Sequence, residues 1–190
     1  MKKIAVCGNI ASGKSTVQNF LEKQGFKVLD TDEVAHKLLT VANVDLYNTF
    51  KEYDVFENGE FSRLKVGKLV FSDKDAKLKL EAILHPQIKK EIEKFFDINS
   101  SEKLLFVGIP LLFEANMQDM FDKIIFVYAD DDIRLKRLIE RNGYSVDYAK
   151  QRINSQLSQD EKINFSDYII RNNGSMSELE KSLTKVVEKL

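Results

Sequence analysis

The residues best suited to do chemistry form one motif near the N-terminus, Gly8–Ser15 (GNIASGKS), which fits the pattern G-x-x-x-x-G-K-[ST]. An apolar run precedes the motif and helical spacing follows it, which is the context the pattern requires. Glycines allow a tight curl, so that backbone N–H groups and a helix N-terminus face a polyphosphate. Lys14 would reach the β- and γ-phosphates, and the Ser15 hydroxyl would bind Mg²⁺. We expect the nucleotide to contact Gly8, Ala11, Ser12, Gly13, Lys14, Ser15 and Thr16.

Two carboxylates, Asp30 and Asp32, follow the second expected strand. Ligands of an open α/β sheet gather at the carboxyl ends of its strands, so a carboxylate there can take the proton of an acceptor hydroxyl as the γ-phosphoryl group leaves ATP. Asp30 with Glu33 three residues later also resembles a helix capping box, which gives Asp30 a structural explanation. Asp32 has no such explanation, and we predict that it is the catalytic base.

Three arginines, Arg134, Arg137 and Arg141, recur at a spacing that places them along one stripe of a helix. As part of a lid they would bring guanidinium groups onto the phosphates and exclude water. The alternative is a solvated basic face that pairs with neighbouring carboxylates. The spacing alone leaves both interpretations open.

Five short apolar runs alternate with helical patterns, at residues 2–7, 26–29, 104–107, 124–128 and 168–170. Continuous apolar runs are typical of parallel strands that are buried on both faces. Their alternation with helices indicates right-handed crossovers. We therefore predict an α/β fold with a parallel sheet of five strands.

Two long helical stretches interrupt the strands. Residues 43–100 contain three helical patterns, and Pro86 is expected to begin the last of them. This stretch is far longer than a plain crossover, so we predict a helical insertion that covers part of the sheet edge. We predict a lid at about 131–164. The 190 residues are expected to form one domain, with its core at about 1–42, 101–130 and 165–190.

Composition excludes several classes of protein. The 29 Lys and Arg nearly balance the 30 Asp and Glu, which weighs against binding to nucleic acid or to an anionic membrane. The single Cys7 excludes an internal disulfide and a cysteine-based zinc site, and we expect it to be a small buried apolar residue. No stretch reaches the roughly 18 apolar residues of a spanning helix. We expect a cytoplasmic protein whose partner is a small-molecule substrate; its oligomeric state is left open.

Among proteins with this loop, a small-molecule kinase fits best. The chain has no N-K-x-D guanine-reading motif and no ABC-type signature, whereas the insertion and the lid suit a kinase that must bind an acceptor. One alternative is a kinase of the same fold that acts on a nucleoside, nucleotide or small metabolite. Another is a non-catalytic ATP-dependent switch, against which the base and the lid arginines argue.

Further motifs continue along almost the whole chain. They are Asp30-x-Asp32, Gly59–Arg63 (GEFSR) followed by Val70-Phe71, His85-Pro86 with Ile88, Pro110-Leu111-Leu112-x-Glu114, Arg137 and Arg141, Gln156, and Asp167-Tyr168-Ile169-Ile170-x-Asn172-x-Gly174. In this order and spacing, the chain resembles the dephospho-coenzyme A kinase family. It departs from the family's usual pattern at Asn9 and Ala11, where Gly is common, at Arg134, where Gln is usual, and at Ser166, where Ala is usual.

The resemblance implies that ATP, with Mg²⁺, phosphorylates the ribose 3′-hydroxyl of dephospho-coenzyme A in the last step of coenzyme A synthesis. It also implies a three-layer α/β fold of the P-loop nucleotide-kinase type, with residues 43–100 as a helical substrate-binding insertion and with a lid. In this fold Asp32 would be the base, Arg137 and Arg141 would contact ATP from the lid, and Arg63 and His85 would lie on the substrate side. Glu114 has three open roles: near the water shell of Mg²⁺, in contact with substrate, or as a helix cap.

Overall fold

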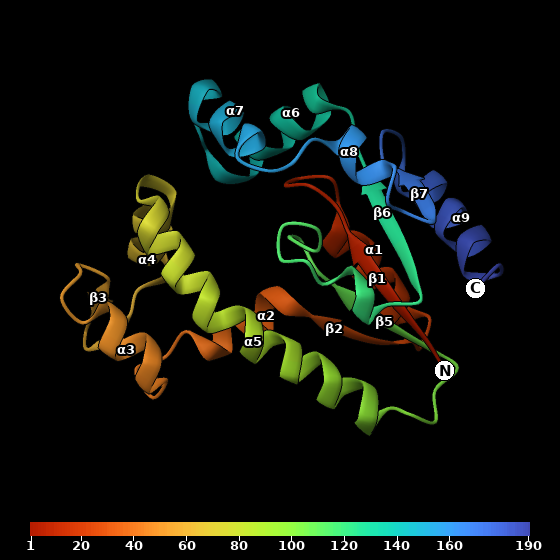
Figure 1. Cartoon of the computed structure of the whole chain (residues 1–190). Helices are drawn as coiled ribbons and strands as arrows, with labels where there is room; N and C mark the ends of the chain where they lie inside the picture. The colour runs from red at the N-terminus through yellow and green to blue at the C-terminus, as the bar shows by residue number, and fades with distance from the viewer. The chain divides into compact units, whose positions relative to one another are not determined.

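The main sheet of the computed structural model, which describes residues 1–190, has five parallel strands in the order β2-β5-β1-β6-β7 (Figure 1). The strands are β1 (Lys2–Cys7), β2 (Lys27–Asp30), β5 (Leu104–Gly108), β6 (Lys123–Tyr128) and β7 (Tyr168–Arg171). Every pairing between them is parallel, which confirms the predicted five-stranded parallel sheet. The first strand occupies the middle of the sheet, and later strands extend it on both sides.

The chain divides into two compact units. The first unit comprises Met1–Asp30 and Phe96–Leu190, and the second comprises Thr31–Phe95. Besides the sheet, the first unit holds α1 (Lys14–Lys23), the 3₁₀ turn η1 (Gln118–Met120), α6 (Asp131–Asn142), α7 (Val146–Asn154), α8 (Gln159–Ile163) and α9 (Met176–Val187). The second unit holds α2 (Thr31–Leu38), α3 (Val44–Phe50), the hairpin of β3 (Phe56–Glu57) and β4 (Glu60–Phe61), α4 (Arg63–Ser72) and most of α5 (Lys74–Ile98).

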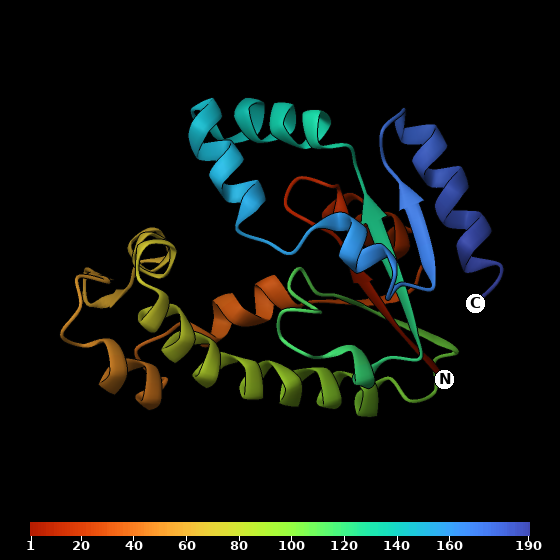
Figure 2. The ribbon, with the colours of Figure 1, turned by 45° about the horizontal axis from the view of Figure 1, so that its top comes forward.

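Helices α1 and α9 cover one face of the sheet, as Figure 2 shows. Their contact with the sheet is a fully apolar cluster that includes Ile4, Val6, Val17, Leu21, Phe106, Ile125, Leu179 and Leu183. The alternate residues of β1, Ala5 and Cys7, point to the opposite face and are equally buried. Burial on both faces explains why β1 is continuously apolar. It also confirms Cys7 as a small buried residue, and this burial raises the pKa of its thiol to about 12.

Helices α6 and α7 lie beyond the carboxyl ends of β1 and β6 (Figure 2). Their shared core consists of Leu138 on α6 with Ala149 and Ile153 on α7, all buried. Two residues of the phosphate-binding motif, Ile10 and Ala11, pack against this core. Apolar contacts therefore bring the segment predicted as a lid onto the motif.

The second unit corrects the expectation at Pro86. Instead of starting a helix, Pro86 lies inside α5, which runs unbroken for 25 residues. Proline costs a helix one hydrogen bond and strains the preceding turn. The buried residues Leu84, Ile88 and Ile92 follow one another at four-residue spacing across the proline. Their continuous burial stabilises the helix on both sides of it.

Two short elements of the second unit were not predicted. Helix α3 starts after Asn43, whose side chain accepts a hydrogen bond from the Leu46 N–H. Strands β3 and β4 form a two-stranded hairpin around Asn58 and Gly59, both with positive φ. Asn-Gly between aromatic residues is a strong hairpin signal, so the sequence did contain this information.

We predict that Pro86→Ala raises the free energy of unfolding by about 2 kcal/mol, because alanine restores the missing N–H and removes the ring from the helix interior. Chemical denaturation measures the change. The matched control is Pro110→Ala, since Pro110 lies outside any helix and should give no comparable gain. A loss of stability in Pro86→Ala would contradict the prediction.

Candidate active site

The phosphate-binding motif curls tightly between β1 and α1. Ala11 has a φ of 62° and Gly13 a φ of 103°, both in the left-handed region. A Cβ on Gly8 would lie 2.5 Å from the Ser12 hydroxyl and 2.7 Å from the Val127 carbonyl oxygen. A Cβ on Gly13 would collide with the side-chain amide nitrogen of Asn172. Both glycines of the motif are therefore required by close approach, and Gly13 also by its backbone conformation.

Two backbone N–H groups of the curl are used within the protein. The Ser12 N–H donates to the Asn9 carbonyl at 3.0 Å. The Ile10 N–H donates to the side-chain carbonyl of Gln156 at 2.7 Å. The N-terminus of α1 directly follows the curl, and this end of a helix favours anions through its dipole and its backbone N–H groups.

Lys14, the first residue of α1, is only 8% exposed. Its ammonium donates to the Gln18 side-chain carbonyl at 2.8 Å and lies 3.3 Å from a carboxylate oxygen of Asp30. Asp30 is the last residue of β2, so the lysine lies at the carboxyl edge of the sheet. From the sequence, Asp30 was interpreted as a helix cap and Gln18 was not singled out, although Gln18 is one helical turn after Lys14.

The Gln18 amide passes over Gly108 at the end of β5. A Cβ on Gly108 would lie within 3 Å of three atoms of that amide. Gln18 is 3% exposed, so the space available to its side chain is fixed by the absence of a side chain at Gly108. The position of Gln18, which binds the Lys14 ammonium, thus depends on the glycine at the end of β5.

Arg137 of α6 is bonded to the motif. Its Nη1 donates to the Ala11 and Ser12 carbonyls at 3.3 and 3.4 Å, and its Nη2 donates to the Asn172 carbonyl at 2.9 Å. The Asn172 side chain in turn donates to the Ser12 carbonyl at 2.8 Å. A solvated basic face does not describe this arginine, because its hydrogen bonds are made with the motif and with the start of the β7–α9 connection.

The other two arginines of the stripe have different surroundings. Arg134 is 2% exposed and pairs with Asp131 at 2.6 Å, while Gln159 donates to the same carboxylate at 3.1 Å. Its Nε and Nη1 are buried without a hydrogen-bond partner. Arg141 is exposed and donates to the side chain of Asn142 at 2.9 Å. The stripe therefore places one residue of three against the motif.

Glu114 forms a buried ion pair with Lys162 of α8, with 2.7 Å between the charged atoms. Lys162 is 1% exposed. The same carboxylate oxygen accepts the Leu157 N–H at 3.3 Å. Of the roles considered from the sequence, this geometry gives Glu114 a structural contact with the segment that leads into α8.

Three predicted site residues belong to the second unit. Asp32 is the exposed second residue of α2, and Arg63 is the exposed first residue of α4. His85 is half-buried on α5. Burial lowers the pKa of the His85 imidazole; Glu81 opposes the shift, and Lys89 and Lys77 add to it. His85 therefore favours the neutral form.

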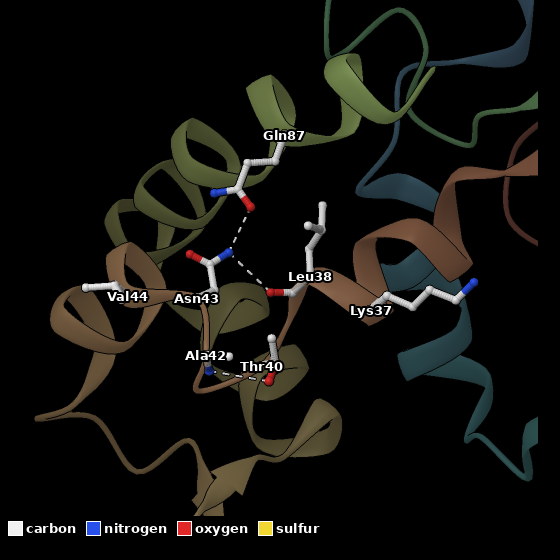
Figure 3. A pocket seen from close by; sticks show the side chains of 7 residues that line it. All are labelled: Lys37, Leu38, Thr40, Ala42, Asn43, Val44 and Gln87. Atoms are coloured by element: carbon white, nitrogen blue, oxygen red, sulfur yellow. Dashed lines mark hydrogen bonds between the residues drawn. The ribbon is translucent and has the colours of Figure 1, made fainter. Parts of the chain in front are cut away.

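The second unit also has an open hollow of about 380 Å³ (Figure 3). It is lined by Lys37, Leu38, Thr40, Ala42, Asn43, Val44 and Gln87. The Asn43 amide nitrogen donates to the Leu38 carbonyl at 3.2 Å and to the Gln87 side chain at 2.8 Å. None of the site residues predicted from the sequence lines it.

The chain contains no group of three His, Cys, Asp or Glu residues arranged to hold a metal ion. The exposed Ser15 hydroxyl, on the first turn of α1, is an oxygen ligand of the kind that Mg²⁺ prefers. The Ser15 hydroxyl therefore fits a Mg²⁺ ion that is also bound by the phosphates of a nucleotide. None of the helices combines the length and apolar character needed to cross a membrane.

A parallel sheet with this loop after its central strand, and a helical segment bonded onto the loop through Arg137, defines the class: a P-loop kinase. Shikimate kinase from Bacteroides thetaiotaomicron has the same fold, with a TM-score of 0.58 at 16% identity over 99% of this chain and 97% of that chain.

The particular family follows from closer relatives. The family model for dephospho-CoA kinase matches residues 3–178. The chain is 36% identical over 195 residues to the dephospho-CoA kinase of Listeria innocua, covering 99% of this chain and 96% of the relative. The dephospho-CoA kinase structure from Campylobacter jejuni has a TM-score of 0.72 at 31% identity, covering 98% and 96% of the two chains. The chain belongs to the dephospho-CoA kinase family, an ATP-dependent kinase family, which confirms the resemblance seen in the sequence.

We predict that Gly13→Ala lowers the free energy of unfolding more than Gly25→Ala does. Both positions have positive φ, which costs alanine about 1–2 kcal/mol. Gly25 has open space around it, whereas alanine at Gly13 must also displace Asn172. Equal losses in chemical denaturation would show that the Asn172 contact is not a constraint.

Proposed function

We propose that this chain transfers the γ-phosphoryl group of ATP to the ribose 3′-hydroxyl of dephospho-coenzyme A, giving coenzyme A and ADP. Family membership supports the reaction. The observation that carries the mechanism is the buried Lys14 ammonium at the N-terminus of α1, held by Gln18 and Asp30. A buried cation beside an anion-binding helix end suits a polyphosphate.

ATP would be bound by the motif and by the lid, which is the segment 131–164. The proposed contacts are Gly8, Ala11, Ser12, Gly13, Lys14, Ser15 and Thr16, with Arg137 and Arg141 from the lid. The contacts of Arg137 with the Ala11 and Ser12 carbonyls support this role, since they place a guanidinium group against the motif. When bound, Mg²⁺ would neutralise charge on the β- and γ-phosphates, and Ser15 would hold it.

The acceptor would be bound by the unit Thr31–Phe95, which we interpret as the substrate-binding insertion. Asp32 would accept the proton of the 3′-hydroxyl as that oxygen bonds to the γ-phosphorus and the bond to the leaving ADP oxygen breaks. Arg63 and the neutral His85 would contact the acceptor. The exposure of Asp32 and Arg63 supports these roles, because neither side chain is buried in the core.

The proposed reaction uses small molecules only, with no nucleic acid and no membrane as partner. We also propose a cytoplasmic location, as expected from the sequence. The decisive experiment is a coupled assay of ADP release that compares dephospho-coenzyme A with a panel of nucleosides, nucleotides and small metabolites. Turnover with dephospho-coenzyme A alone supports the proposal, and a preference for another acceptor contradicts it.

We predict that Lys14→Ala lowers turnover by at least about hundredfold without unfolding the chain. The reason is that the variant lacks the lysine's positive charge, which stabilises the negative charge of the transferring phosphoryl group. Steady-state kinetics and circular dichroism measure the two effects. The control is Lys23→Ala, an exposed lysine at the other end of α1, which should keep its activity. Near-normal turnover of Lys14→Ala would refute the assignment.

We predict that Asp32→Asn lowers kcat by about 10²–10⁴ and leaves ATP affinity unchanged, because the base acts only on the acceptor hydroxyl. Its exposed neighbour gives a matched control, Glu33→Gln, which should remain active. Weaker ATP binding with normal kcat would instead assign Asp32 to the metal ion.

A further inference from the structure

We propose that Asn9 and Gln156 are positioning residues, which fasten the α7–α8 connection (residues 155–158) to the phosphate-binding motif and thereby hold the motif ready for ATP. The inference rests on the proposed function, because it concerns ATP binding at the same motif. We call the two side-chain hydrogen bonds involved the loop tether.

The loop tether joins segments that are almost 150 residues apart in the sequence. The Ile10 N–H donates to the Gln156 side-chain carbonyl at 2.7 Å. The Asn9 side-chain nitrogen donates to the Leu157 carbonyl at 2.9 Å. Two adjacent motif residues therefore hold two adjacent residues of the connection. Asn9 is 3% exposed, so its bond is shielded from competing water.

The connection is fixed from its other side as well. The Leu157 N–H donates to Glu114, which forms the buried ion pair with Lys162. The Leu157 carbonyl thus accepts a hydrogen bond from the motif, and its N–H donates one to Glu114, which lies a few residues beyond β5. The tether therefore links the motif to a segment that is itself bonded to Glu114.

Stability alone does not account for Asn9. Its side-chain oxygen is buried and has no hydrogen-bond partner. An unsatisfied buried acceptor destabilises a protein, and this cost offsets what the bond to Leu157 contributes. A side chain with little net effect on stability, but with a bond that fixes the motif, has the properties of a positioning residue.

The consequence concerns affinity for ATP. A motif already fixed in its curl loses less conformational entropy when ATP binds, so binding is tighter. Without the tether, ATP must order the motif itself. The acceptor has no part in this step, so its binding should not change.

The test is calorimetric titration of ATP with Mg²⁺ into the wild-type chain, Asn9→Gly, Gln156→Ala and the double variant. Each single variant should bind ATP about five- to tenfold more weakly, since each removes one of the two bonds that order the motif. The fold-loss of ATP affinity in the double variant should be smaller than the product of the two single fold-losses, because both bonds hold the same segment. The KM for dephospho-coenzyme A should stay within about twofold.

The matched control is Ser155→Ala, since Ser155 is exposed on the same connection and bonds only locally, to the Arg152 carbonyl at 2.8 Å. It should bind ATP normally. Single variants with unchanged ATP affinity, or effects that multiply fully in the double variant, would overturn the proposal. If the wild-type chain itself fails to bind ATP, the proposed function fails instead.

A measurement without substitutions keeps the proposal testable should a variant not fold. In the wild-type chain, ATP with Mg²⁺ should slow hydrogen exchange of the backbone N–H groups in residues 155–158 as well as in the motif. Protection confined to the motif would overturn the loop tether.

Discussion

The burial of one ammonium group constrains much of this structure. A lysine taken out of water must be paired, and Lys14 has both an amide and a carboxylate within reach. The amide belongs to Gln18, whose path requires a glycine at the end of β5. The carboxylate belongs to the last residue of β2, which pairs with the same strand. One charged side chain thus accounts for residues on a helix and on two strands.

The phosphate-binding motif is held by contacts from three directions. Arg137 binds its carbonyls from α6, Asn172 binds it from the end of β7, and Gln156 binds one of its N–H groups from the α7–α8 connection. None of these partners is near the motif in the sequence. Such contacts fix the backbone of a loop that has no secondary structure of its own, and a fixed loop binds a charged ligand without first reorganising.

Local sequence signals were enough to predict the strands and the phosphate-binding motif, but they did not predict the contacts between segments that are distant in the sequence. The apolar runs predicted all five strands, and the motif was found where it was expected, since both depend on neighbouring residues. The same local reasoning ended a helix at Pro86, where burial of Leu84 and Ile88 continues it. The capping pattern at Asp30 concealed its contact with Lys14, and helical spacing could not separate the buried Arg134 from the exposed Arg141. These outcomes depend on strands and helices distant in the sequence, and periodicity carries no information about them.

The order of the strands has a consequence for the newly made chain. β1 pairs only with β5 and β6, and β2 pairs only with β5, so no pair of the main sheet can form before residue 104 has been synthesised. The unit Thr31–Phe95 is contiguous, so all of it is synthesised before the strands of the main sheet can pair. On the ribosome, the apolar β1 must therefore wait in an unpaired state while about a hundred further residues emerge, an interval in which a chaperone has most to protect.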